Sequence, residues 1–371
     1  MARKTSLDLR SQVGQLLILG FDGTEFTPDL CNRLSLLQPG GIILFARNIV
    51  SAEQTNSLLR ESYRTVEAPM FLCVDMEGGT VDRLKNVIAP APSVEQVSST
   101  GVKKLFREHG RLIGEEVRAL GFNVDFAPVV DLAFKASRSV LSSRTVSADP
   151  KATIAYAKEF LRGLKDAHVL GCGKHFPGLG EANLDTHSEL PAIDKPWKKL
   201  WEQDLLPYRQ LRSQLPFVMV AHCAFPGVTR DTTPASVSKK WITDILRKKI
   251  GYRGLVISDD LEMGGVQKAL PIEQAAVETI RAGADIYLIC HNDDFVHRSY
   301  DAVLREAEKN SRFREQVVTA AKRIITFKKR SSEIKRRMAK APDEACVAKL
   351  RRKNWLFTEE VRLAANRRLA M

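Results

Sequence analysis

The chain has 371 residues, of which 44% are hydrophobic, so it can form a full core as one large α/β barrel or as two ordinary domains. No apolar run approaches the roughly 20 residues that a membrane span needs. The N-terminal stretch lacks a small-residue cleavage site, so we expect a cytoplasmic protein. Four of the six cysteines, Cys73, Cys172, Cys223 and Cys290, lie in short apolar runs, which favours reduced core residues over a disulfide framework. No CxxC pair is present, so a structural zinc site has little support.

The formal net charge of +13 is concentrated at one end of the chain. Residues 322–371 carry 16 Lys and Arg against 5 Asp and Glu, and the rest is close to neutral. Such a segment is either a solvated helical tail or a surface patch for an anionic partner, including nucleic acid or a membrane surface. We predict a domain over residues 1–320 and a basic, helical C-terminal extension over 321–371, and we expect no nucleic-acid partner.

Eight short apolar runs follow one another along the chain, each ending in polar or glycine-rich sequence. They span residues 15–23, 40–48, 68–79, 122–131, 169–178, 217–227, 254–260 and 284–292. The runs are rich in Val, Ile and Leu without alternation, which is typical of parallel strands buried on both faces.

Segments of helical character lie between these runs. They include residues 28–37, 51–66, 101–120, 150–167, 198–213, 238–250 and 271–283. Gly121, Gly251 and Gly283 each mark a helix end shortly before a strand. Eight strands alternating with about eight helices predict an α/β fold of the (β/α)8 TIM-barrel type, with a doubly wound sheet as the alternative.

In a (β/α)8 barrel the active site lies at the C-terminal ends of the strands. Almost every predicted strand ends in a charged or polar residue, which a purely structural barrel would not need. These strand-end residues are Asp22, Asn48, Asp75, Asp131, Lys174, His175, His222, Asp259, Asp260, His291 and Asn292. The pattern therefore predicts an enzyme.

Two kinds of chemistry fit histidines and aspartates at a barrel rim. One is metal binding, but the chain lacks HxH and HExxH spacing, and its tightest ligand pair is Asp185-x-His187. The other is proton transfer, because an aspartate beside a histidine orients the imidazole. We favour proton transfer and expect no metal and no other cofactor.

The run GLVISDD places Asp259 at the end of a buried strand, where a carboxylate is held firmly and partly shielded from water. In a sugar hydrolase, such a carboxylate can attack the anomeric carbon as the bond to the leaving group breaks. The alternative is structural, with one of Asp259 and Asp260 capping the next helix, and Asp260 is the better candidate for that cap.

Several long motifs resemble those of glycoside hydrolase family 3, and within it the single-domain β-N-acetylglucosaminidases of peptidoglycan recycling. Between residues 12 and 310 they are VDMEGGTVDRL, DFAPVVDL, KHFPGLG followed by DTH, VMVAHCAFP and GLVISDDLEM. The resemblance implies a retaining exo-β-N-acetylglucosaminidase with a monomeric barrel. Its implied substrates are saccharides or muropeptides that carry terminal GlcNAc linked to MurNAc or anhydroMurNAc.

The resemblance also implies roles for individual residues. Asp259 is the nucleophile, His187 the general acid/base on a mobile loop, and Asp185 the residue that orients His187. The implied substrate-binding residues are Asp75, Arg83, Arg144, Lys174 and His175. Structural alternatives stand beside two of these assignments, an ion pair at the strand end for Lys174-His175 and a surface helix position for Arg83.

Leu179, Met76 and Thr80 replace residues that are usually polar in the family pattern, which bears on substrate detail more than on reaction type. Three other functions stay open. A phosphorylase would use phosphate in place of water, since a histidine acid/base does not repel an anionic acceptor as a carboxylate would. A family 3 β-glucosidase is the second, and a sugar-binding barrel without activity is the third.

Overall fold

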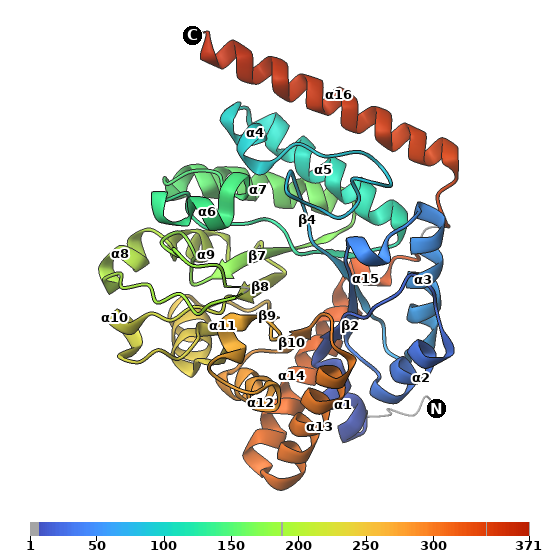
Figure 1. The fold of residues 1–371 in the computed structure, drawn as a ribbon, viewed down its shortest axis with the longest axis vertical. Helices are drawn as coiled ribbons and strands as arrows, with labels where there is room; N and C mark the ends of the chain where they lie inside the picture. Colours follow the sequence, from blue (N-terminus) through green and yellow to red (C-terminus); the bar gives the residue numbers. More distant parts are fainter. Residues whose placement is uncertain (1–6, 187, 339, 371) are drawn as a thin grey trace.

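The computed structural model describes residues 7–186, 188–338 and 340–370, so the predicted His187 lies outside the described residues. Eight parallel strands close into a barrel in the order β1-β10-β9-β8-β7-β6-β3-β2 (Figure 1). Their bounds are β1 Leu17–Leu19, β2 Gly41–Leu44, β3 Phe71–Val74, β6 Val124–Asp125, β7 Leu170–Phe176, β8 Phe217–Val220, β9 Leu255–Asp260 and β10 Ile286–Ile289. Each predicted apolar run contains one of these strands, and the (β/α)8 prediction is confirmed.

The strands are buried on both faces, which explains their unbroken apolar sequence. Every residue of β1, β2 and β3 is buried, because the barrel interior covers one face and the helices cover the other. The first and last strands close the barrel, with Leu19 paired to Ile289 and to Ile42.

Helices surround the barrel in Figure 1. They are α1 Leu9–Gln15, α2 Pro28–Leu37, α3 Ala52–Thr65, α4 Val94–Ser99, α5 Lys103–Leu120, α6 Arg138–Leu141, α7 Pro150–Asp166, α8 Trp197–Glu202, α9 Leu206–Leu211, α10 Pro226–Thr229, α11 Gly264–Gln267, α12 Ile272–Ala282, α13 Asp293–Lys309, α14 Ser311–Arg330, α15 Ser332–Lys335 and α16 Glu344–Leu369. The segment predicted over 238–250 forms a π-helix, η5 Lys240–Lys249, and the segment over 198–213 divides into α8 and α9.

A small antiparallel hairpin interrupts the alternation after β3. Its strands are β4 Met76–Gly78 and β5 Val81–Asp82. Gly78 and Gly79 turn the chain with φ of 83° and 61°, which favours glycine. A Cβ at Gly78 would also lie 2.2 Å from the Pro92 carbonyl oxygen. The hairpin brings Glu77 to the mouth of the barrel.

The C-terminal part is helical, as predicted. The boundary proposed at residues 320 and 321 falls inside α14, which continues to Arg330 with Ala321, Ile324 and Lys328 buried against the barrel. Beyond it, α16 lies across α4 and α5 at the side of the barrel (Figure 1). Among the described residues, no helix is both long and apolar enough to cross a membrane.

Candidate active site

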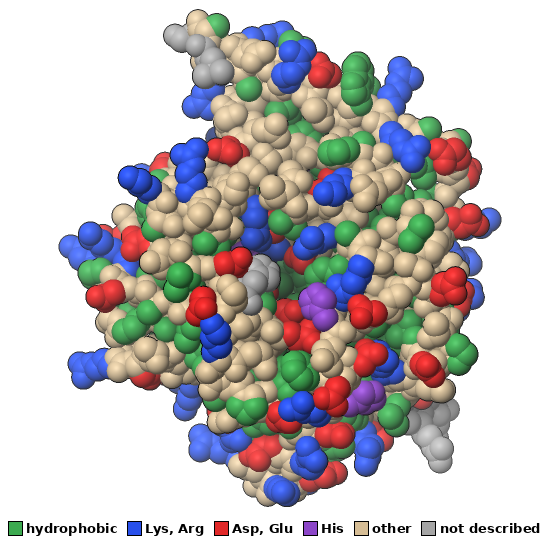
Figure 2. All heavy atoms as spheres, in the orientation of Figure 1, with side chains coloured by type: hydrophobic (Ala, Val, Ile, Leu, Met, Phe, Trp, Pro, Cys, Tyr) green, Lys and Arg blue, Asp and Glu red, His purple; other side chains and the backbone are tan. Residues whose placement is uncertain are grey.

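A cavity of about 430 Å³ opens at the C-terminal ends of the strands. Seven predicted site residues line it, namely Asp75, Arg83, Arg144, Lys174, His175, Asp185 and Asp259. Figure 2 shows a hollow near the centre of the face, where the barrel lies in Figure 1, with charged side chains and a histidine around it. The structure therefore gathers residues that are up to 184 positions apart in the sequence into one pocket, as expected of parallel strands that end at one rim.

Asp259 is the penultimate residue of β9 and lies half-buried in the wall of the cavity. The backbone N–H of Asp260 donates to Asp259 Oδ1 at 2.9 Å. Burial alone would raise the pKa of Asp259, but the neighbouring His175 and Lys174 and this N–H outweigh it, so the pKa lies below its usual value. The carboxylate is therefore ionised and held in one position.

Lys174 is the centre of a buried ion-pair network at the rim. Its Nζ lies 2.7 Å from Asp75 Oδ1 and 2.6 Å from Glu77 Oε1. Arg144 binds the same Glu77 with two bonds, Nε to Oε2 at 2.8 Å and Nη2 to Oε1 at 2.9 Å. The strand-end ion pair that the sequence allowed at Lys174 is thus present, and it lies in the pocket wall.

The network fixes the charge of its members. Burial alone would raise the pKa of Glu77, but the Arg144 and Lys174 cations outweigh it and hold that pKa well below the usual range. For Lys174, burial lowers the pKa, yet Asp75 and Glu77 raise it above its usual value. Both stay charged at neutral pH. Glu77 was missed by the sequence interpretation, although it stands two residues after Asp75.

Asp131 lies directly behind His175 and does not line the cavity. This buried carboxylate accepts from His175 Nδ1 at 2.7 Å, from the His175 backbone N–H at 3.1 Å and from the Leu179 N–H at 2.8 Å. The bond to Nδ1 leaves Nε2 of His175 as the ring nitrogen available to a ligand. The role of Asp131 is to position His175 and the start of the following loop.

Arg83 follows the hairpin and lines the cavity, so the alternative that placed it on a surface helix is wrong. Its Nε is buried and has no hydrogen-bond partner among the described residues. Its guanidinium lies 5.5 Å from the Phe45 ring centroid, on which Arg47 also packs at 4.7 Å. Arg83 thus places its guanidinium in the wall of the pocket.

The loop between β7 and α8 carries Asp185 over the cavity. The Gly265 N–H donates to the Thr186 carbonyl at 3.0 Å and seats the loop on α11. A Cβ on Gly264 would lie 2.6 Å from the Ser188 carbonyl oxygen, and one on Gly265 would lie 2.9 Å from that of Thr186. Only glycine allows the loop to approach so closely.

The three residues that depart from the family pattern lie in different surroundings. Leu179 is buried and lines the cavity, Met76 is buried in the barrel core, and Thr80 is exposed at the hairpin. Of the three, Leu179 is therefore the one placed to contact a substrate.

His222 supports β9 from behind. Burial lowers its pKa, so the ring is neutral. Nε2–H donates to the Asp260 carbonyl at 2.8 Å, since a carbonyl only accepts, and Nδ1 accepts from the Ser236 hydroxyl at 2.7 Å. Asp260 itself caps no helix. Met263 occupies the N-cap position of α11, and Asp260 Oδ1 accepts from the Glu262 N–H at 3.1 Å, which corrects the sequence expectation.

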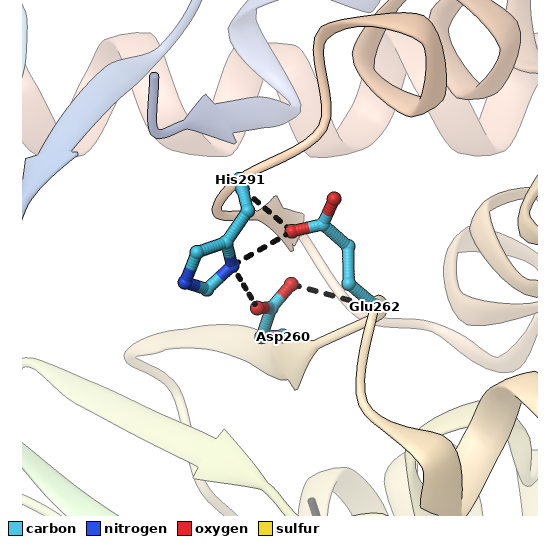
Figure 3. A group of neighbouring side chains, drawn as sticks. All are labelled: Asp260, Glu262 and His291. Atoms are coloured by element: carbon cyan, nitrogen blue, oxygen red, sulfur yellow. Dashed lines mark hydrogen bonds and ion pairs between the residues drawn. The ribbon is translucent and has the colours of Figure 1, made fainter. Parts of the chain in front are cut away.

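His291 forms a cluster with two carboxylates at the rim (Figure 3). Its Nδ1 lies 3.0 Å from Glu262 Oε2 and 3.4 Å from Asp260 Oδ2, and these two partners raise the pKa of His291 to about 9. The three groups could each offer one atom to a metal ion. Glu262, however, already accepts from the backbone N–H groups of Cys290, His291 and Asn292 and so holds the turn before α13. The cluster therefore holds the backbone between β10 and α13 in place at the rim of the pocket.

The remaining strand-end residues serve the structure. Asp22 is exposed and pairs with Arg47 at 2.9 Å. Asn48 is buried and donates to the carbonyls of Phe21 and Gly23. Asn292 caps α13 by accepting from the Phe295 N–H at 3.2 Å. Strand-end position alone thus does not distinguish pocket residues from supporting ones.

The fold and the pocket define a (β/α)8-barrel enzyme with an ionised carboxylate beside a buried ion-pair network. The chain belongs to glycosyl hydrolase family 3, whose N-terminal domain model matches residues 8–327. It is therefore a glycoside hydrolase.

Similar proteins agree with this membership. The chain is 33% identical over 299 residues to a β-hexosaminidase of Idiomarina loihiensis, covering 80% of this chain and 89% of that protein. It is 35% identical over 285 residues to a β-hexosaminidase of Thiobacillus denitrificans, covering 75% and 79%. The structure of a family 3 β-N-acetylglucosaminidase from Paenibacillus sp. superposes with a TM-score of 0.90 at 30% identity, over 96% of this chain and 69% of that one.

Proposed function

We propose that the protein is a retaining exo-β-N-acetylglucosaminidase that removes terminal, non-reducing β-linked GlcNAc by double displacement. The observation that carries the proposal is the Asp259 carboxylate, which is fixed at the end of β9, borders the cavity and has a lowered pKa. The relatives named β-hexosaminidase and the Paenibacillus enzyme support the choice of sugar.

In the first step, Asp259 attacks the anomeric carbon and His187 donates a proton to the departing oxygen. In the second step, His187 takes a proton from water, which attacks the same carbon and releases Asp259. Asp185 holds the His187 tautomer and stabilises the imidazolium. The hydrogen bond from the Gly265 N–H to the Thr186 carbonyl supports this arrangement, because it holds the residue next to Asp185 against α11.

The sugar in this proposal is held by Asp75, Arg83, Arg144, Lys174 and His175. Carboxylates accept from hydroxyl groups, while the lysine and arginines donate to sugar oxygens. The cavity of about 430 Å³ at the strand ends lies within the usual size range of small-molecule sites, so it can accept a terminal sugar.

The proposed substrates are muropeptides or disaccharides with GlcNAc on MurNAc or anhydroMurNAc. We place the enzyme in the cytoplasm, in peptidoglycan recycling, and expect it to act as a monomer without a cofactor. These assignments rest on the resemblance of the motifs to recycling enzymes of the family.

The test is hydrolysis of a chromogenic β-N-acetylglucosaminide. We expect Asp259→Asn to lower kcat/KM at least about a thousandfold and His187→Ala about 10²- to 10⁴-fold. Asp301→Asn, an exposed aspartate on α13, is the matched control and should leave the rate unchanged. An active Asp259→Asn variant would contradict the proposal.

The same assay decides between the alternatives. Turnover that requires inorganic phosphate and yields a sugar 1-phosphate would identify a phosphorylase. Cleavage of β-glucosides without cleavage of β-N-acetylglucosaminides would identify a β-glucosidase. A folded protein that is inactive on every aryl glycoside would indicate a sugar-binding barrel.

A further inference from the structure

The helix α16 has an inward face that is firmly attached to the barrel. The side chains of Val347, Leu350, Phe357 and Val361 on this face of α16 are buried. Asn354, also buried, donates to Glu116 Oε1 at 2.9 Å and to the Ala89 carbonyl at 3.2 Å. These contacts fix the rotation of α16 about its axis, so its opposite face is presented to solvent in one orientation.

That outward face carries large apolar side chains. Trp355, Leu356 and Leu363 are 62%, 50% and 47% exposed, and the helical period places them on the side away from Phe357 and Val361. All four tryptophans lie in described parts of the chain, and only Trp355 is exposed. A single exposed leucine is ordinary, but a tryptophan beside two leucines on one helix face marks a contact surface.

Exposed cations accompany the apolar side chains. Lys349, Arg352, Arg362 and Arg367 are exposed on α16, as are the acidic Glu344 and Glu360. Arg362 pairs with the partly exposed Glu359 at 2.7 Å. Arg336, Arg337 and Lys340 are exposed just before the helix and carry the same charge. The excess of basic residues in 322–371 therefore includes exposed cations on α16 and in the segment before it, and Arg362 offsets Glu359, which stands three or four residues from each of the three apolar side chains.

We propose that the outward face of α16 binds an anionic membrane surface, with Trp355, Leu356 and Leu363 in the interface and the basic residues at lipid phosphates. An interfacial helix is recognised by this combination of Trp and Leu with Lys and Arg, and anionic lipids attract basic residues close to the membrane. The proposal does not depend on the catalytic function.

Two other occupants fit the surface less well. A nucleic acid would be met by cations but would leave the leucines without a role. A second copy of the chain would place cations against cations, and three side chains cover far less than the roughly 1,200 Å² of a stable interface. An anionic lipid surface can bind the cations at its phosphates and the apolar side chains in its interface.

The position of α16 leaves the active site accessible. The helix lies across α4 and α5 at the side of the barrel, while the pocket opens at the C-terminal ends of the strands (Figure 1). A protein bound to a membrane through α16 would therefore keep the mouth of its pocket uncovered, so that substrate can still enter.

The test is co-sedimentation of the full chain with phosphatidylcholine vesicles, with and without phosphatidylglycerol. We expect binding only to the anionic vesicles and weaker binding at high salt. Two variants address the two features, Trp355→Ser/Leu356→Ser/Leu363→Ser and Lys349→Glu/Arg352→Glu. Each should weaken binding at least about tenfold, since each basic residue and each apolar side chain contributes to interfacial affinity.

Controls separate loss of binding from loss of folding. Leu36→Ser and Lys198→Glu change an exposed leucine and an exposed lysine elsewhere and should bind as the wild type does. Circular dichroism and thermal melting verify that each variant is folded. The proposal is overturned if anionic vesicles are not bound, or if the α16 variants bind normally. It is also overturned if the apolar variant instead abolishes a concentration-dependent dimer, or if RNA is bound while vesicles are not.

Discussion

Two lysines are buried at opposite ends of the barrel and have opposite surroundings. Lys174, on β7 at the rim, contacts the carboxylates of Asp75 and Glu77. Lys328, on α14 at the floor, donates to Gln15 Oε1 at 2.8 Å and the Gly40 carbonyl at 2.7 Å, with Nζ 4.5 Å from the Phe71 ring centroid. Lys174 has anionic partners, whereas Lys328 has neutral ones.

The pKa values of the two lysines differ accordingly. Burial lowers the pKa of both, but for Lys174 the carboxylates reverse the effect, and its pKa lies above the usual value. Burial lowers the pKa of Lys328 to about 7, with little to oppose it. The comparison shows that partners, rather than burial alone, decide whether a buried group keeps its charge. At the rim, Lys174 and Glu77 stabilise each other's charged form, whereas Lys328 at the floor has no anionic partner in the described part of the chain to stabilise its charge.

The largest expected effect is that of Lys174→Met. It leaves Asp75 and Glu77 without their shared cation, and breaking a buried ion pair on one side costs about 3–5 kcal/mol. We expect the free energy of unfolding from urea denaturation to fall by this amount, and glycosidase activity to be lost. Lys198→Met, at an exposed lysine, is the control. A Lys174→Met protein as stable as the wild type would show that the rim charges do not depend on each other.

Glu77→Gln should have a smaller effect, because it keeps the shape of the side chain. It weakens the hydrogen bonds from Arg144 and Lys174, which should cost about 1.5–3 kcal/mol at neutral pH. The pKa of Glu77 is lowered in the folded protein, so its contribution is present above about pH 4.3 and lost as the pH falls further. The difference between wild type and variant should therefore shrink in acid. A difference that is constant from pH 7 to pH 3, by urea denaturation, would contradict this account.

Lys328→Met should have the smallest effect on the free energy of unfolding at neutral pH, and it should appear instead as a change in the slope of that free energy with pH. The folded pKa of about 7 lies below the unfolded value, so between these two values the unfolded chain binds more protons. The wild-type free energy of unfolding therefore rises with pH from about 7 to about 10, by at most about 1.4 kcal/mol per pH unit from this group. The variant should lack this component, and exposed Lys329→Met should retain it. Equal slopes in all three proteins would mean that Lys328 remains charged when buried.

The Lys174 network illustrates what could be predicted from the sequence. Strand-end position and motif both indicated Lys174 and Asp75, while the family resemblance alone indicated Arg144, and all three line one cavity. Glu77 was missed, since it belongs to a hairpin rather than to a barrel strand. Lys328 was missed because a lysine in a basic tail gives no sign that its side chain is buried.

The sequence by itself determined the order of strands and helices and the family, because both are carried by local apolar periodicity and by contiguous motifs. It also marked the residues at the rim. Only the tertiary structure decided which of them face the cavity and which support it, as Asp131 supports His175. It also decided that α16 packs on α5 through one face and exposes Trp355 on the other. The reason is that burial and electrostatic pairing depend on neighbours far away in the chain, which a local pattern does not contain.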